Sequence, residues 1–81
     1  MRTGYFIENN FFGFIHAPKE LEKKLKDEGF EVFQSFQLLS GDYKIVVRLP
    51  KLDQKNAVEK LLEILKEVQN EHLTKIEKKV T

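Results

Sequence analysis

The feature that most constrains the fold is a segment in which core-facing and outward-facing residues alternate with a period of two. Successive side chains of a strand point to opposite faces of a sheet, so such alternation predicts a strand. Between residues 43 and 49 the side chains expected to face a core are Tyr43, Ile45, Val47 and Leu49, and those expected to face outward are Lys44, Val46 and Arg48. The turn Ser40-Gly41-Asp42 precedes this segment and predicts a hairpin with the residues before it.

The preceding segment, residues 30–39, also has a period of two. The side chains expected to face the core are Phe30, Val32, Phe36 and Leu38, with Gln34 as an exception. Those expected on the opposite side are Glu31, Phe33, Ser35, Gln37 and Leu39. The two segments together predict an antiparallel pair of strands.

A first hairpin is predicted over Thr3–His16, where two stretches of β-forming residues flank Asn9-Asn10. Asparagine tolerates positive φ, which a type I′ turn requires at both central positions. Gly13 inside the second strand predicts a bulge or a close approach of another group to the backbone.

Two helices are predicted. Pro18 is expected at the first position of one helix, Leu21 and Leu25 form its narrow apolar stripe, and Gly29 ends it. The second is expected to begin after Asp53 as N-cap, with a broad apolar stripe of Ala57, Val58, Leu61, Leu62, Ile64, Leu65 and Val68. We expect this helix to reach about Glu71. The 4-3-4 spacing through Leu73, Ile76 and Val80 would allow it to continue and to pack in a coiled coil, whereas a break at Asn70 would leave Leu73–Val80 as an edge strand.

The 81 residues fit one domain. The predicted fold class is α+β: a two-layer sandwich with a mainly antiparallel four-stranded sheet and two helices on one face, in the order ββαββα. If the first strand is peripheral and the last residues form a strand, the order becomes the ferredoxin-like βαββαβ.

One short segment has a counterpart in a known family. Leu39-Ser40-Gly41-Asp42-Tyr43-Lys44-Ile45-Val46-Val47, followed by a helix, resembles part of the effector-binding half of leucine-responsive transcriptional regulators. The resemblance covers about ten residues around a common turn, and Lys44 replaces another residue type. It implies a ferredoxin-like module that dimerises through its sheet, and it transfers no site residues.

Composition limits the classes of partner and the location. The net charge is +1, with 33% charged residues, whereas a dedicated nucleic-acid binder carries a clear basic excess. Cysteine is absent, which fits a reducing compartment, and no apolar run is long enough to span a membrane. We therefore expect a cytoplasmic protein without membrane contact. The many Lys and Glu residues are compatible with a thermophilic source.

The sheet carries more large apolar residues than one core face can accommodate. Phe11, Phe12, Phe14 and Ile15 supply both faces of one strand, and Phe33 and Val46 point away from the expected core. An aromatic patch on an open sheet face marks a binding surface. The sequence therefore predicts a small non-enzymatic, regulatory module that forms homo-oligomers, in the simplest case a homodimer, and binds protein through this face. The candidate site residues are Phe11, Phe33, Val46, Lys44 and Arg48.

The alternative function is nucleic-acid binding by the same face, because Lys44 and Arg48 flank Val46. Phe12-Gly13-Phe14-Ile15 also matches the centre of the aromatic motif with which RNA-recognition domains stack bases. The Lys/Arg-Gly pair that usually precedes that motif is Asn10-Phe11 here.

No enzyme activity is expected. The two histidines, His16 and His72, have no sequence spacing that links them to a nucleophile or a carboxylate cluster. The four glycines are scattered, so no phosphate-binding loop is predicted, and we expect neither a metal nor a cofactor.

Overall fold

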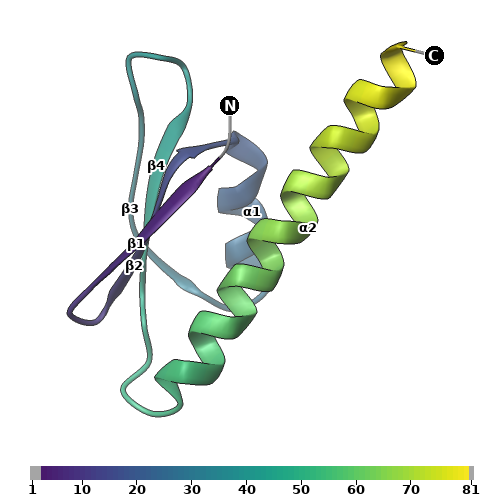
Figure 1. Cartoon of the computed structure of the whole chain (residues 1–81). Helices are drawn as coiled ribbons and strands as arrows, with labels where there is room; N and C mark the ends of the chain where they lie inside the picture. The colour runs from purple at the N-terminus through teal and green to yellow at the C-terminus, as the bar shows by residue number, and fades with distance from the viewer. Residues whose placement is uncertain (1–2, 81) are drawn as a thin grey trace.

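The structure is a computed structural model that describes the backbone of residues 3–80 and the side chains of residues 3–70. Four strands form one sheet, and both helices lie against the same face of it (Figure 1). The elements are β1 (Gly4–Glu8), β2 (Phe11–Ala17), α1 (Lys19–Asp27), β3 (Glu31–Gln37), β4 (Tyr43–Arg48) and α2 (Gln54–Val80). The sheet order is β1-β2-β4-β3, and every neighbouring pair is antiparallel. The predicted α+β class and the ββαββα order are confirmed.

The first hairpin forms as predicted, with a different turn. All five residues of β1 pair with β2, from Gly4 opposite Ile15 to Glu8 opposite Phe11. Asn9 has φ 53°, but Asn10 is not among the residues with positive φ, so the turn departs from the type I′ pattern. Strand β1 is thus a regular member of the sheet.

Helix α1 begins one residue later than predicted and ends at its glycine. Pro18 is the N-cap and not the first helical residue. At the other end, the Gly29 N–H donates to the Lys26 carbonyl and the Phe30 N–H donates to the Leu25 carbonyl, both at 3.0 Å. Gly29 has φ 90°. These two hydrogen bonds around a left-handed residue form a Schellman motif, which turns the chain directly into β3.

Replacing Gly29 by alanine is expected to lower the free energy of unfolding by about 1–2 kcal/mol, because an L side chain disfavours the left-handed conformation. A Cβ at this position would meet nothing within 4 Å, so the effect is purely one of backbone conformation. Urea unfolding checks the value. Gly29→Asn is the control and should lose less, since asparagine tolerates positive φ; equal losses would contradict the explanation.

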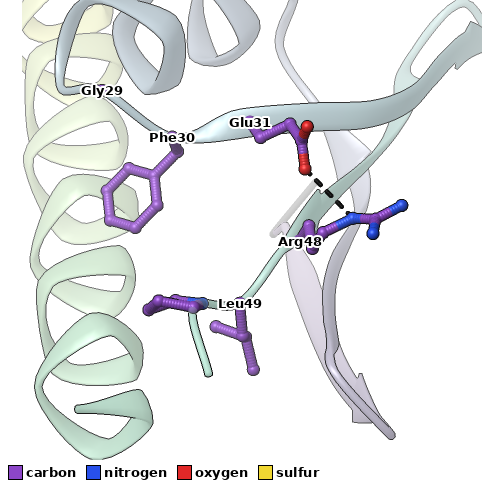
Figure 2. Close-up of a pocket in the computed structure, with 6 residues that line it drawn as sticks. Gly29, Phe30, Glu31, Arg48 and Leu49 are labelled. Carbon is purple, nitrogen blue, oxygen red and sulfur yellow. Dashed lines mark ion pairs between the residues drawn. The ribbon is translucent and has the colours of Figure 1, made fainter. Parts of the chain in front are cut away.

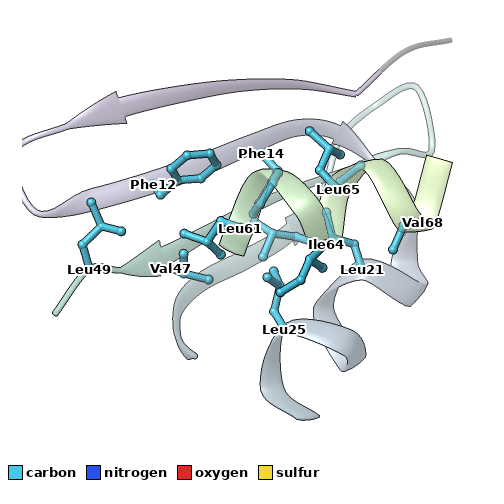
Figure 3. Packing of buried hydrophobic residues seen from close by; sticks show 12 residues of the cluster. Phe12, Phe14, Leu21, Leu25, Val47, Leu49, Leu61, Ile64, Leu65 and Val68 are labelled. Atoms are coloured by element: carbon cyan, nitrogen blue, oxygen red, sulfur yellow. The ribbon is translucent and has the colours of Figure 1, made fainter. Parts of the chain in front are cut away.

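The core lies between the helices and one face of the sheet (Figure 3). Phe12 and Phe14 of β2 are fully buried and pack there beside the apolar residues of β4. The other buried members are Ala17 from β2, Ile45, Val47 and Leu49 from β4 and its end, Leu21 and Leu25 from α1, and Leu61, Ile64, Leu65 and Val68 from α2. The helical stripes predicted from the sequence are the ones that cover the sheet.

Helix α2 is longer than expected. It has 27 residues and continues to Val80, past the expected end near Glu71, so the continued helix is the alternative that the chain adopts and Leu73–Val80 is not an edge strand. Asp53 directly precedes it, and its carbonyl accepts the N–H of Ala57 at 3.0 Å. The last turns extend past the sheet (Figure 1). The side chains of Leu73, Ile76 and Val80, on which a coiled coil would depend, lie outside the described residues. With β1 paired and the C-terminal segment helical, the ferredoxin-like alternative is not adopted.

Candidate functional site: the open face of the sheet

Strand register defines the sheet face that neither helix covers. Residues directly opposite each other in a ladder share a face, and Phe12, Phe14, Ile45 and Val47 face the helices. The alternate positions therefore form the other face, which we call the open face. Its members are Gly4, Phe6 and Glu8 of β1, Phe11, Gly13 and Ile15 of β2, Lys44, Val46 and Arg48 of β4, and Glu31, Phe33, Gln34 and Phe36 of β3.

A bulge in β3 places both Phe33 and Phe36 on the open face. Val32 pairs with Val47 and Gln34 pairs with Val46, so Phe33 is an extra residue between them. An inserted residue moves every following side chain to the opposite face. Phe36 pairs with Lys44 as a result and is 46% exposed. The prediction that Phe36 faces the core is therefore wrong, and Ser35 takes that side instead.

The open face contains two cations, each within cation–π distance of two phenyl rings. The Nζ atom of Lys44 lies 5.4 Å from the centroid of the Phe6 ring and 5.8 Å from that of Phe36. The guanidinium carbon of Arg48 lies 5.6 Å from the Phe11 ring and 5.4 Å from the Phe33 ring. These distances fall within cation–π range, so both cations hold aromatic rings in place. Phe11 and Phe33 also contact each other directly, with centroids 4.8 Å apart.

Gly13 allows one of these rings to lie flat on the sheet. Phe6 is the cross-strand partner of Gly13, and a Cβ on Gly13 would overlap the Phe6 ring. The close approach predicted for Gly13 is thus confirmed, whereas the irregularity of β2 falls later, between Phe14 and Ala17. There His16 has φ 56°. Val46, the partner of Gly13 on β4, is only 6% exposed and forms the floor of the open face.

The structure brings all five predicted site residues together on this face. Phe11, Phe33 and Arg48 contact one another, whereas Lys44 contacts Phe6 and Phe36. Val46 is only 6% exposed and so lies beneath the surface of this face. Sequence reasoning missed Phe6 and Phe36. The hairpin register opposite Gly13 could have identified Phe6, but only the bulge identifies Phe36.

The strand register is incompatible with the base-stacking role that the match to RNA-recognition domains suggests. Phe12 and Phe14, the rings that would stack on bases, have no exposed surface and belong to the core. The motif positions that reach the open face are Gly13 and Ile15. The four-residue match therefore reflects core packing and carries no argument for base stacking.

Charge on the open face is balanced. Within the four strands it carries two positive side chains, Lys44 and Arg48, and two negative ones, Glu8 and Glu31. The Glu31 carboxylate accepts the Nε of Arg48 at 3.0 Å, so part of this charge is already paired. No strongly basic surface results.

A shallow hollow of about 300 Å³ adjoins the open face at the Glu31–Arg48 pair (Figure 2). Gly29, Phe30, Leu49 and Pro50 complete its lining. Its only charged groups are bonded to each other, so the hollow offers a ligand no unpaired charge.

His16 has one carboxylate neighbour, with its Nδ1 3.3 Å from Oδ2 of Asp42. Both side chains are just over one-third exposed. The pair links the irregular part of β2 to the β3–β4 turn. In the part of the chain that the structure describes, no three potential metal ligands gather, and no helix is long and apolar enough to cross a membrane. The side chain of His72 lies outside the described residues.

Comparison with known proteins yields no relative: no family model, no curated protein and no solved structure matches the chain. The candidate function therefore depends on the physical properties of the open face.

Proposed function

We propose that this chain is a small non-enzymatic, homo-oligomeric binding module that acts through protein–protein contacts of its open face. The observation that carries the proposal is the set of four phenyl rings on a sheet face that both helices leave uncovered, with Phe33 50% and Phe36 46% exposed. Aromatic side chains and arginine are enriched at the centres of protein interfaces.

The exposed area of the open-face rings supports this proposal. Each half-exposed ring leaves about 100 Å² uncovered. Burying that area gains about 2.5 kcal/mol per ring, so Phe33 and Phe36 from both copies of a dimer, four rings in all, gain about 10 kcal/mol. This is comparable with the ~4–15 kcal/mol that association costs in lost freedom.

The balanced charge favours a second copy over a phosphate backbone. Two such faces can meet with the cations of each copy near the carboxylates of the other, whereas nucleic acid needs a net positive surface. The absence of cysteine fits a reducing compartment, so the cytoplasm is the proposed location.

Nucleic-acid binding by the open face is the second candidate, because Lys44 and Arg48 lie among the aromatic rings as they would in a single-strand binding groove. Light scattering at low and physiological salt, with and without a single-stranded oligonucleotide, separates the two. A salt-insensitive oligomer without added nucleic acid supports the first proposal. A monomer that binds the oligonucleotide with a steep salt dependence supports the second.

Replacing Phe33 by aspartate is expected to weaken self-association at least about a hundredfold, because a carboxylate in the centre of an apolar interface is desolvated. Far-UV circular dichroism should stay unchanged, since the ring is half exposed. Sedimentation over a wide concentration range measures the change. Leu39→Asp is the matched control, because Leu39 is fully exposed in the turn before Asp42 and off the open face. Unchanged association of the Phe33 variant would contradict the proposed interface.

A further inference from the structure

The two edge strands of the sheet differ in how well they are protected against pairing with another strand. Strand β3 is bulged at Phe33 and carries the polar residues Gln34, Ser35 and Gln37. Strand β1 pairs with β2 in an unbroken register, contains no Lys or Pro, and has Glu8 as its only charge. Bulges, charges and proline are the devices by which natural sheets block their edges. The β1 edge has neither a bulge nor a proline, and its one charge, Glu8, is at the last residue of the strand.

Two large apolar side chains on β1 are also left uncovered. Tyr5 and Ile7 share the helix-facing side with Phe14 and Phe12, to which they are paired. Tyr5 stacks on the Phe12 ring at 5.4 Å, yet Tyr5 is 52% and Ile7 53% exposed. The helices therefore do not extend over this edge, and the sheet has an apolar margin on the face opposite to the open face.

We propose that β1 pairs antiparallel with β1 of a second copy, around a two-fold axis at Phe6, to form a continuous eight-stranded sheet. In this register Tyr5 lies opposite the partner's Ile7, and Gly4 lies opposite the partner's Glu8. An aromatic residue opposite a β-branched one is a favourable cross-strand pair. The two Glu8 carboxylates lie at opposite ends of the paired segment, so no like charges meet. The strand is thus complementary to itself, which is what a two-fold contact requires.

This contact is independent of the open face. Edge pairing uses main-chain hydrogen bonds in the plane of the sheet, whereas the open face packs perpendicular to that plane. Both contacts can exist in one assembly, in which case the chain forms a tetramer with two kinds of interface. Loss of one contact should then leave a dimer held by the other.

Cysteine cross-linking tests the edge register directly, because the chain contains no cysteine. The variants Tyr5→Cys and Ile7→Cys are mixed and oxidised mildly. The register places position 5 opposite position 7, so the mixture should form a disulfide-linked heterodimer and each variant alone should form little. Cross-linking of each variant with itself to the same extent as in the mixture would overturn the register. No cross-linking in the mixture at concentrations where the protein associates would overturn the edge contact.

The mass of Ile7→Lys in solution provides the second measurement. Lysine on an edge strand opposes pairing, so we expect this variant to have half the mass of the unchanged protein. Gln37→Lys places the same residue on the β3 edge and should leave the mass unchanged. An unaltered mass for Ile7→Lys, or a monomeric unchanged protein, would overturn the proposal. The double variant Ile7→Lys with Phe33→Asp should be monomeric if both contacts exist. A Phe33→Asp protein that keeps its full mass while Ile7→Lys halves it would refute the open-face interface alone.

Discussion

Replacing Phe14 by alanine is expected to lower the free energy of unfolding by about 3–5 kcal/mol. Phe14 has no exposed surface and contacts Phe12, with ring centroids 5.0 Å apart, in the middle of the cluster between sheet and helices. A domain of this size has a total stability of roughly 4–12 kcal/mol. The substitution thus removes a large part of it, and the protein should be partly unfolded at 37 °C.

Urea unfolding monitored by circular dichroism measures this loss. Phe36→Ala is the matched control, because Phe36 is 46% exposed on the open face and leaves no closed cavity. The loss of unfolding free energy for this variant should stay below about 1.5 kcal/mol, since nearly half of the Phe36 side chain is exposed to solvent. Similar losses for the two variants would mean that the two faces of the sheet are not divided as the register indicates.

Gly13→Val is expected to destabilise the protein by about 3 kcal/mol, because the new side chain must displace the Phe6 ring. The displaced ring would also leave its cation, Lys44. Gly13 does not have positive φ, so valine is compatible with the backbone and the penalty arises from the ring alone.

A double-mutant cycle isolates this contact. In a Phe6→Ala background the space above position 13 is free, and valine suits a strand, so Gly13→Val should be neutral or slightly stabilising. The expected coupling between the two positions is about 3 kcal/mol. Additive effects of the two substitutions would show that the ring does not lie over Gly13 in solution.

The fold followed from local patterns because each pattern has a direct physical cause. The alternation from Tyr43 to Arg48 predicted β4 and both of its faces correctly, since a regular strand has a fixed period. The left-handed turn at Gly29 and the stripe from Leu61 to Val68 were likewise readable, because a cap and a helical face involve residues close in sequence.

The errors occurred where a residue without a distinctive side chain changed the register. Nothing in Glu31–Gln37 marks Phe33 as the bulged residue, so the face of Phe36 could not be deduced from the period. The end of α2 was uncertain for a similar reason. The 4-3-4 spacing through Leu73, Ile76 and Val80 suits a continued helix, whereas Asn70 is a residue at which a helix can end.

The class of fold, the order of the elements and the surplus of aromatic residues over what one core can bury were all predictable from the amino-acid sequence. Each of these depends on composition and on spacing along the chain. The tertiary structure decided which rings share a face: it enclosed Phe12 and Phe14, placed Phe6 over Gly13, and turned Phe36 outward to join Phe33. The physical reason is that a sheet face is assembled from strands distant in sequence, and one inserted residue in β3 reassigns every side chain that follows it.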